Sequence, residues 1–232
     1  MRQSLPVGID ELLQEFQAPA PSLNGGSAAA VVAAIAASLV VMVGRHSPSW
    51  NEGAATAAAA ERLRERLLVL ADEDVEVVAV LIAASRESRT GEWSTDLIAA
   101  LLRSSQVPLE IAEQAADVAV LARAASSEGT PPMRADAAAA ATLAASATAV
   151  AITIVKGNLA APQLHEFERD LARIREATQV AAQRATSSAA SREPGIGKEQ
   201  STAENDPREA YRETRRAIEQ MWEEQNEGNP HP

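Results

Sequence analysis

Two long stretches of this chain contain no charged residue. They span residues 28–43 and 137–155 and are rich in alanine, with valine, serine and threonine between. Alanine is the strongest helix former, so both stretches are expected to be helical. A helix without a polar face must be covered by other parts of the protein or by a partner. We therefore predict that both stretches are buried helices at the centre of a bundle.

The overall composition also favours helices over strands. Hydrophobic residues make up 46% of the 232 residues, but aromatic residues make up only 3%. Small side chains let helices pack closely, whereas sheets are usually rich in β-branched and aromatic residues. We predict an all-α fold, an alanine-rich antiparallel helical bundle with the two chargeless helices buried at its centre.

A membrane protein is the main alternative to this fold, because about 20 apolar residues suffice to cross a bilayer. We favour a bundle outside the membrane. Both stretches are rich in alanine, serine and threonine, the first is short, and the regions between them have the pattern of amphipathic helices.

Charge and cysteine content exclude further classes of function. The formal net charge is −11, whereas a nucleic-acid-binding surface needs clustered lysine and arginine. The chain has no cysteine and no apparent signal peptide, which suits a reducing cytoplasm. His46, His165 and His231 lie far apart in unlike contexts, so a zinc or iron site is not expected. We expect a cytoplasmic protein that binds neither nucleic acid nor membrane.

Apolar residues at helical spacing predict the other elements. The expected helices cover residues 9–17, 54–86, 92–104, 107–125 and 162–185. The helix 9–17 is expected to lie as a lid over the bundle. Pro108 would fall in the first turn of a separate helix, where its missing N–H has no cost.

The composition changes near residue 186 and suggests three regions. Residues 1–185 are predicted to form the helical domain. Residues 186–206 are rich in serine, glycine, glutamate and glutamine and predict a disordered linker. Residues 207–232 are predicted to form a charged helix and tail, which either docks on the domain or is simply solvated.

The first chargeless stretch is preceded by Gly25, Gly26 and Ser27. Glycine lets a ligand approach the backbone closely, and the first N–H groups of a helix are free to bind an anion. The local alternative is that Ser27 is an ordinary N-cap and the glycines form only a turn.

Asp74 interrupts the apolar stripe of its predicted helix, between Leu70 and Val78. A carboxylate at such a position faces the core, where it needs a partner or a function. The alternative is an exposed or merely hydrogen-bonded aspartate.

Charged residues also lie at both ends of the second stretch. Arg134 and Asp136 precede it, and Lys156 follows it. Asp136 could be only an N-cap, and Lys156 could only complement the helix dipole. Twenty residues of straight helix span about 30 Å, so Asp136 and Lys156 cannot serve one small site within one subunit. Either a second subunit supplies one of them, or only one is functional.

Several of these residues resemble one family in the same order. The run Pro-Ser-Leu-Asn-Gly-Gly-Ser-Ala-Ala-Ala at residues 21–30 is similar to the opening of the formiminotransferase-cyclodeaminase C-terminal domain and of stand-alone methenyltetrahydrofolate cyclohydrolases. Further similarities are Asp74, the run Val-Pro-Leu-Glu-Ile-Ala at 107–112, Asp136, and Asn158 with its following leucine. Together they cover about residues 10–180.

The resemblance implies an all-helical homodimer that acts on a one-carbon tetrahydrofolate without a metal or other cofactor. It implies that Gly25, Gly26, Ser27 and Asp136 line the folate site. Asp136 would then be the catalytic carboxylate, with Asp74 as a second candidate. Additional substrate contacts are expected from Arg134, Lys156 and Asn158, the two cations holding the glutamate tail.

The expected reaction is hydrolysis of 5,10-methenyltetrahydrofolate to 10-formyltetrahydrofolate. It ranks above formiminotetrahydrofolate cyclodeamination, which releases ammonia, because no formiminotransferase domain is fused here. A third alternative is a non-catalytic binding or scaffold protein. It is suggested by four departures from the family pattern, at Asn24, residues 77–78, residues 130–132 and Ile154.

Overall fold

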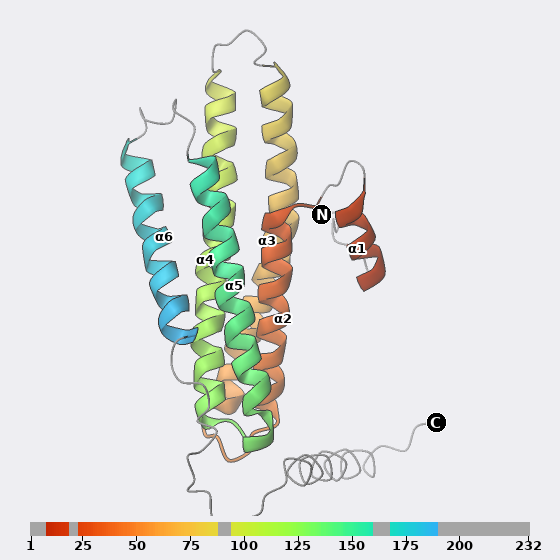
Figure 1. The fold of residues 1–232 in the computed structure, drawn as a ribbon, viewed down its shortest axis with the longest axis vertical. Helices are drawn as coiled ribbons and strands as arrows, with labels where there is room; N and C mark the ends of the chain where they lie inside the picture. Colours follow the sequence, from red (N-terminus) through yellow and green to blue (C-terminus); the bar gives the residue numbers. More distant parts are fainter. Residues whose placement is uncertain (1–7, 19–22, 88–93, 160–167, 190–232) are drawn as a thin grey trace, which may run out of the picture. The chain divides into compact units, whose positions relative to one another are not determined.

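The computed structural model describes residues 8–18, 23–87, 94–159 and 168–189. Within these ranges the chain is helical and contains no strand (Figure 1). The elements are α1 (Ile9–Gln17), α2 (Gly25–Arg45), α3 (Gly53–Glu87), α4 (Thr95–Glu128), the 3₁₀ helix η1 (Pro131–Met133), α5 (Arg134–Asn158) and α6 (Glu168–Ala189). The predicted all-α bundle is confirmed. The chain divides into two compact units, 1–191 and 192–232, and all described residues belong to the first. The linker was predicted to begin at residue 186, but α6 continues to Ala189. The rest of the predicted linker and the charged C-terminal helix lie outside the described residues.

Alanine forms most of the core, as the two chargeless stretches suggest. Ala33 and Ala37 of α2 and Ala140 and Ala144 of α5 are completely buried. Because these side chains are small, the helices can approach each other closely. Helix α4 packs against α2, α3, α5 and α6, while α2 also packs against α3 and α5. The core therefore lies where α2, α4 and α5 meet.

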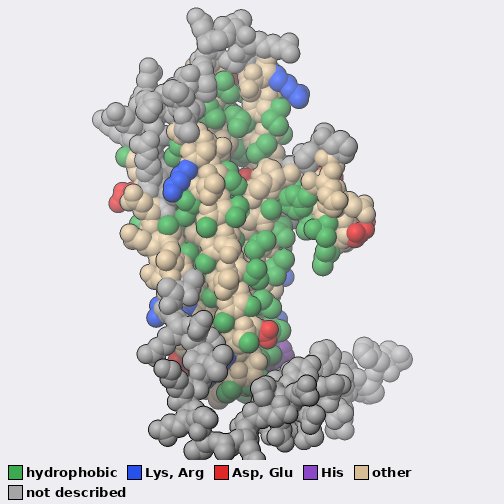
Figure 2. All heavy atoms as spheres, viewed as in Figure 1, with side chains coloured by type: hydrophobic (Ala, Val, Ile, Leu, Met, Phe, Trp, Pro, Cys, Tyr) green, Lys and Arg blue, Asp and Glu red, His purple; other side chains and the backbone are tan. Residues whose placement is uncertain are grey.

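Neither chargeless helix is buried on every side. Ile35 of α2 is 51% exposed and Val150 of α5 is 45% exposed. Figure 2 shows hydrophobic side chains along the visible face of α2 and α5, with few charged ones among them. This apolar face, which we call the α2–α5 face, has no partner within the described part of the chain.

Helix α2 and the segment Pro131–Asn158 are long and apolar enough to cross a membrane by length and composition. In the most apolar 18-residue stretch of α2, 61% is buried within the protein. In the corresponding stretch of Pro131–Asn158, 44% is buried. Core helices of soluble proteins pass the same test, so this observation is weak support for a membrane protein.

Two expectations about individual helices are wrong. Helix α1 is not a packed lid, because none of its residues is buried and Ile9 is 79% exposed. Residues 92–104 and 107–125 do not form two helices, because α4 runs without a break through Pro108. Proline inside a helix leaves the carbonyl four residues earlier without its donor. Here that carbonyl belongs to Ser104, and it accepts a hydrogen bond from Asn158 of α5 at 2.7 Å.

Candidate functional site

Polar groups of two helices meet at the N-terminus of α2. Asn24 is the N-cap, and its Oδ1 accepts a hydrogen bond from the Gly26 N–H at 2.7 Å. Ser27 closes a capping box, because its Oγ accepts from the Asn24 N–H at 2.8 Å. Ser27 is therefore the third residue of the helix and not its N-cap. The arrangement fixes the first turn of α2 and directs its backbone N–H groups toward α3.

Asp74 lies against this first turn. It comes from the middle of α3 and is only 2% exposed. A Cβ placed at Gly26 would lie 2.5 Å from Asp74 Oδ2 and 2.6 Å from Asp74 Cγ, closer than real Cβ contacts allow. Only glycine at position 26 therefore leaves room for the carboxyl. The sequence interpretation of Asp74 as an inward-facing carboxylate agrees with this burial.

Burial raises the pKa of the Asp74 carboxyl, because the charged form loses its hydration. The Asn24 side chain and the Ser27 backbone N–H oppose this rise by favouring the charged form. Even so, Asp74 Oδ2 and Asn24 Nδ2 are buried without a hydrogen bond of acceptable geometry to any described group. Buried polar atoms normally have well-formed hydrogen bonds, so these two atoms at a helix N-terminus are candidates for contact with a ligand.

The anion that faces this helix end is thus part of the protein itself. The sequence suggested that the N–H groups after Gly25 could hold an external anion. In the structure, the Asn24 side chain accepts from one of them and the buried Asp74 carboxyl lies against the same turn. The two atoms without a well-formed hydrogen bond are a carboxyl oxygen and an amide nitrogen. They suit a ligand with a cationic or N–H-bearing part and a nearby acceptor.

The C-terminal end of α5 completes this side of the cluster. Ile154 Cδ1 would lie 3.4 Å from a Cβ placed at Gly25, so an apolar side chain lies beside the α2 N-terminus. Asn158 is one turn further on and donates its amide to Ser104. Lys156 is exposed and, two residues from Ile154, lies about 200° around the helix from it.

Arg134 and Asp136 lie at the other end of α5 (Figure 1). Asp136 is exposed in the first turn, and the N-cap of α5 is Met133. The suggestion that Asp136 is only an N-cap is therefore wrong. Arg134 Nε donates to the Gly129 carbonyl at 2.9 Å. Eighteen residues of helix separate Asp136 from Ile154, about 27 Å, so one subunit does not bring Asp136 to Asp74.

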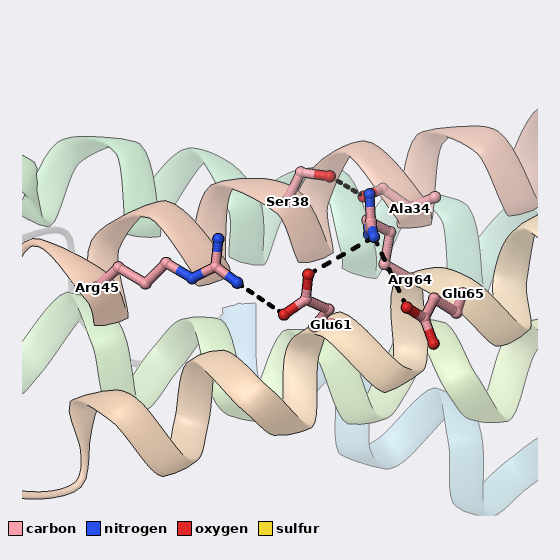
Figure 3. Close-up of polar contacts among 6 residues, drawn as sticks. All are labelled: Ala34, Ser38, Arg45, Glu61, Arg64 and Glu65. Atoms are coloured by element: carbon pink, nitrogen blue, oxygen red, sulfur yellow. Dashed lines mark hydrogen bonds and ion pairs between the residues drawn. The ribbon is translucent and has the colours of Figure 1, made fainter.

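A second polar group lies between α2 and α3 (Figure 3). Arg45 Nη2 lies 2.7 Å from Glu61 Oε2, while Arg64 Nη2 lies 3.7 Å from Glu61 and 3.9 Å from Glu65. All four side chains are more than a third exposed, so each pair contributes about 1 kcal/mol or less. Only the Arg45–Glu61 pair joins α2 to α3, and the two Arg64 pairs lie within α3. None of these exposed side chains is a buried polar group without a hydrogen bond, unlike the cluster at Asp74.

The cluster includes three residues that the sequence did not propose as functional, namely Asn24, Ser104 and Ile154. Asn24 and Ile154 were noticed only as departures from a family pattern. Ser104 contributes a backbone carbonyl, for which a side-chain pattern contains no signal. The only available hint was Pro108, four residues further along the helix.

Comparison with known proteins now identifies the family. The formiminotransferase-cyclodeaminase family model matches residues 8–179, which include the whole cluster around Asp74. The chain belongs to this family. The family resemblance inferred from the motifs is thereby confirmed. No curated protein matches the sequence significantly.

A solved structure has the same fold. The crystal structure of formiminotetrahydrofolate cyclodeaminase from Thermotoga maritima superimposes with a TM-score of 0.64 and 20% sequence identity. The match covers 78% of this chain and 95% of that one. At this identity the likeness concerns the helical bundle.

Gly26→Ala tests the geometry of the cluster. The added methyl group would overlap the Asp74 carboxyl, so we expect a loss of about 1–3 kcal/mol in the free energy of unfolding, measured with urea. Gly157→Ala is the matched control, because a Cβ there meets nothing within 4 Å. A Gly26→Ala protein as stable as the control would show that Asp74 does not pack against Gly26.

Proposed function

We propose that this family member hydrolyses 5,10-methenyltetrahydrofolate to 10-formyltetrahydrofolate. The observation that supports the proposal is the buried carboxyl of Asp74 at the N-terminus of α2, whose Oδ2 has no hydrogen bond of good geometry to a described group. The methenyl carbon of this substrate lies between two nitrogens and shares a positive charge with them. A carboxylate in a water-poor site attracts such a cation more strongly than it would in water.

Asp74 can carry the proton in both halves of the reaction. Water adds through its oxygen to the methenyl carbon, and the ionised Asp74 accepts the proton that the water loses. The bond from this carbon to N5 then breaks, Asp74 returns the proton to N5, and the remaining hydroxyl proton leaves as the formyl C=O forms. Burial raises the pKa of Asp74 toward the pH at which such an acid and base works best.

The substrate already carries the positive charge that polarises its carbon, so the proposal requires no metal or prosthetic group. We place the reaction in the cytoplasm, as the absence of cysteine suggests. Neither nucleic acid nor a membrane has a role in it.

A second subunit supplies Asp136 in this proposal. The α2–α5 face exposes Ile35 and Val150, and homodimers use the same surface of both subunits. A two-fold axis across the middle of α5 exchanges the two ends of that helix. Asp136 of a second copy then lies near the α2 N-terminus, on the side where Ile154 of the first copy is. We assign the exposed cations at the two ends of α5, Arg134 and Lys156, to the glutamate tail of the substrate.

The test is the loss of the 5,10-methenyltetrahydrofolate absorbance, compared with spontaneous hydrolysis in the same buffer. We expect faster loss with the protein. Release of ammonia from 5-formiminotetrahydrofolate would instead support the cyclodeaminase activity after which the Thermotoga maritima structure is named. A protein that does neither would be a non-catalytic homologue, and the proposal would be wrong.

A further inference from the structure

Pro108 and Asn158 form a pair across α4 and α5. Proline has no N–H, so Pro108 cannot donate to the carbonyl of Ser104, which is the normal helical acceptor four residues earlier. Ser104 is 3% exposed, and a buried carbonyl without a donor is costly. The side chain of Asn158 supplies the missing donor, with Nδ2 2.7 Å from the Ser104 oxygen.

The hydrogen bond also fixes the last turn of α5 relative to α4. Asn158 is the last residue of α5, and Ile154 lies one turn before it. Ile154 is the residue that approaches Gly25, directly beside the Asn24 cap. A shift of this turn would therefore move the apolar wall of the site. It would also move α5 relative to the first turn of α2, against which Asp74 packs.

We propose that Asn158 is a positioning residue of the site, acting through the carbonyl that Pro108 leaves free. Its amide N–H₂ is committed to Ser104, so it contributes to the reaction by holding the end of α5 and not by binding substrate through that group. The inference rests on the proposed function, because the site it positions is the one assigned to folate hydrolysis.

A purely structural role for Asn158 makes a different prediction. If the asparagine serves only to satisfy the Ser104 carbonyl, an alanine at position 108 can replace it, because the N–H of that alanine can donate within α4. The same alanine cannot replace the hydrogen bond between α5 and α4 that Asn158 makes with the Ser104 carbonyl. The Pro108→Ala background therefore separates satisfaction of the carbonyl from positioning of α5.

The experiment compares Asn158→Ala, Pro108→Ala and the double variant with the unaltered protein. We expect Asn158→Ala to lower Tm by about 3–10 °C, and the double variant to regain most of this loss. A misplacement of about 1 Å can cost about 100-fold in rate. We therefore expect kcat/KM to fall at least about tenfold in both Asn158→Ala proteins, at a temperature where each is folded, and not in Pro108→Ala.

Recovery of kcat/KM in the double variant would overturn the proposal, since the asparagine would then be replaceable by any donor to Ser104. Unchanged activity in Asn158→Ala would do the same. If Asn158→Ala does not fold, the double variant alone carries the test. Asn51→Ala, which removes an exposed asparagine from the α2–α3 loop, is the control and should change neither quantity.

A second readout does not depend on turnover. The ¹³C-methyl resonance of Ile154 Cδ1, assigned with Ile154→Val, reports the packing of this side chain at Gly25. We expect it to shift in both Asn158→Ala proteins and to stay in place in Pro108→Ala. An unshifted resonance would overturn the positioning role even if the protein hydrolyses the folate. A shifted resonance in a protein without activity would contradict only the proposed function.

Discussion

We expect the Asp74→Asn variant to hydrolyse 5,10-methenyltetrahydrofolate about 10²- to 10⁴-fold more slowly than the unaltered protein. Asparagine has nearly the shape of aspartate and can occupy the space beside Gly26, but it neither accepts a proton from water nor carries a negative charge. The measurement is kcat under saturating substrate. Glu76→Gln, which changes an exposed carboxylate two residues further along α3, is the control and should leave kcat unchanged.

The same variant should be more stable than the unaltered protein at neutral pH. Burial raises the pKa of Asp74 in the folded state above its ordinary value of 3.8. As the pH rises above that value, the unfolded chain loses the proton first, which favours unfolding up to the folded pKa. Above the folded pKa, the loss in the free energy of unfolding keeps its full value. Asparagine is not ionised, so the Asp74→Asn variant avoids this loss.

The stability advantage of Asp74→Asn should therefore shrink on acidification and disappear below the ordinary pKa of 3.8. Urea unfolding at neutral pH and at acid pH measures it. Lower activity together with higher stability is the behaviour expected of a residue kept for function. A variant that loses stability at neutral pH and keeps its activity would show that Asp74 serves the fold alone.

The second large effect is expected at Asp136. Asp136→Asn should lower turnover by about 100-fold or more, because a positioned carboxylate is lost. The fold should not change, because Asp136 is exposed in the first turn of α5 and is not the N-cap of this helix. Equal melting temperatures of the variant and the unaltered protein would confirm the latter point, and near-normal turnover would remove Asp136 from the site.

Mixed dimers test whether Asp74 and Asp136 of different subunits share one site. The inactive Asp74→Asn and Asp136→Asn proteins are unfolded together, refolded as a mixture and assayed. If each site combines the two subunits, a mixed dimer contains one site with both aspartates, so activity returns. In a monomer, or in a dimer with each site inside one subunit, no site regains both residues and the mixture stays inactive.

The burial of Asp74 was predictable because a helical stripe has a fixed period, and a carboxylate at an apolar position of that stripe must face inward. Its contact with Gly26 was not predictable in this way. The two residues lie on different helices, and their approach depends on how α2 and α3 pack. The glycine drew attention for its backbone freedom, whereas its role in the structure is to leave space for a side chain.

Pro108 shows how tertiary contacts override a local rule. Proline is well placed in the first turn of a helix, so a helix start at this point was a sound local prediction. The structure continues the helix because Asn158, 50 residues further along the chain, supplies the donor that proline lacks.

The family resemblance placed Asp136 in the folate site. The length of α5, however, separates Asp136 from Asp74 within one subunit.

The alanine core has a consequence for how the protein can move. An alanine side chain has no rotamers, so a core built from Ala33, Ala37, Ala140 and Ala144 cannot adjust by side-chain rearrangement. Any response to a ligand must then be a displacement of a whole helix or the opening of a helix end. The cluster at Asp74 occupies such an end. Amide hydrogen exchange should accordingly be slowest in the middle of α2 and α5 and fastest at their termini.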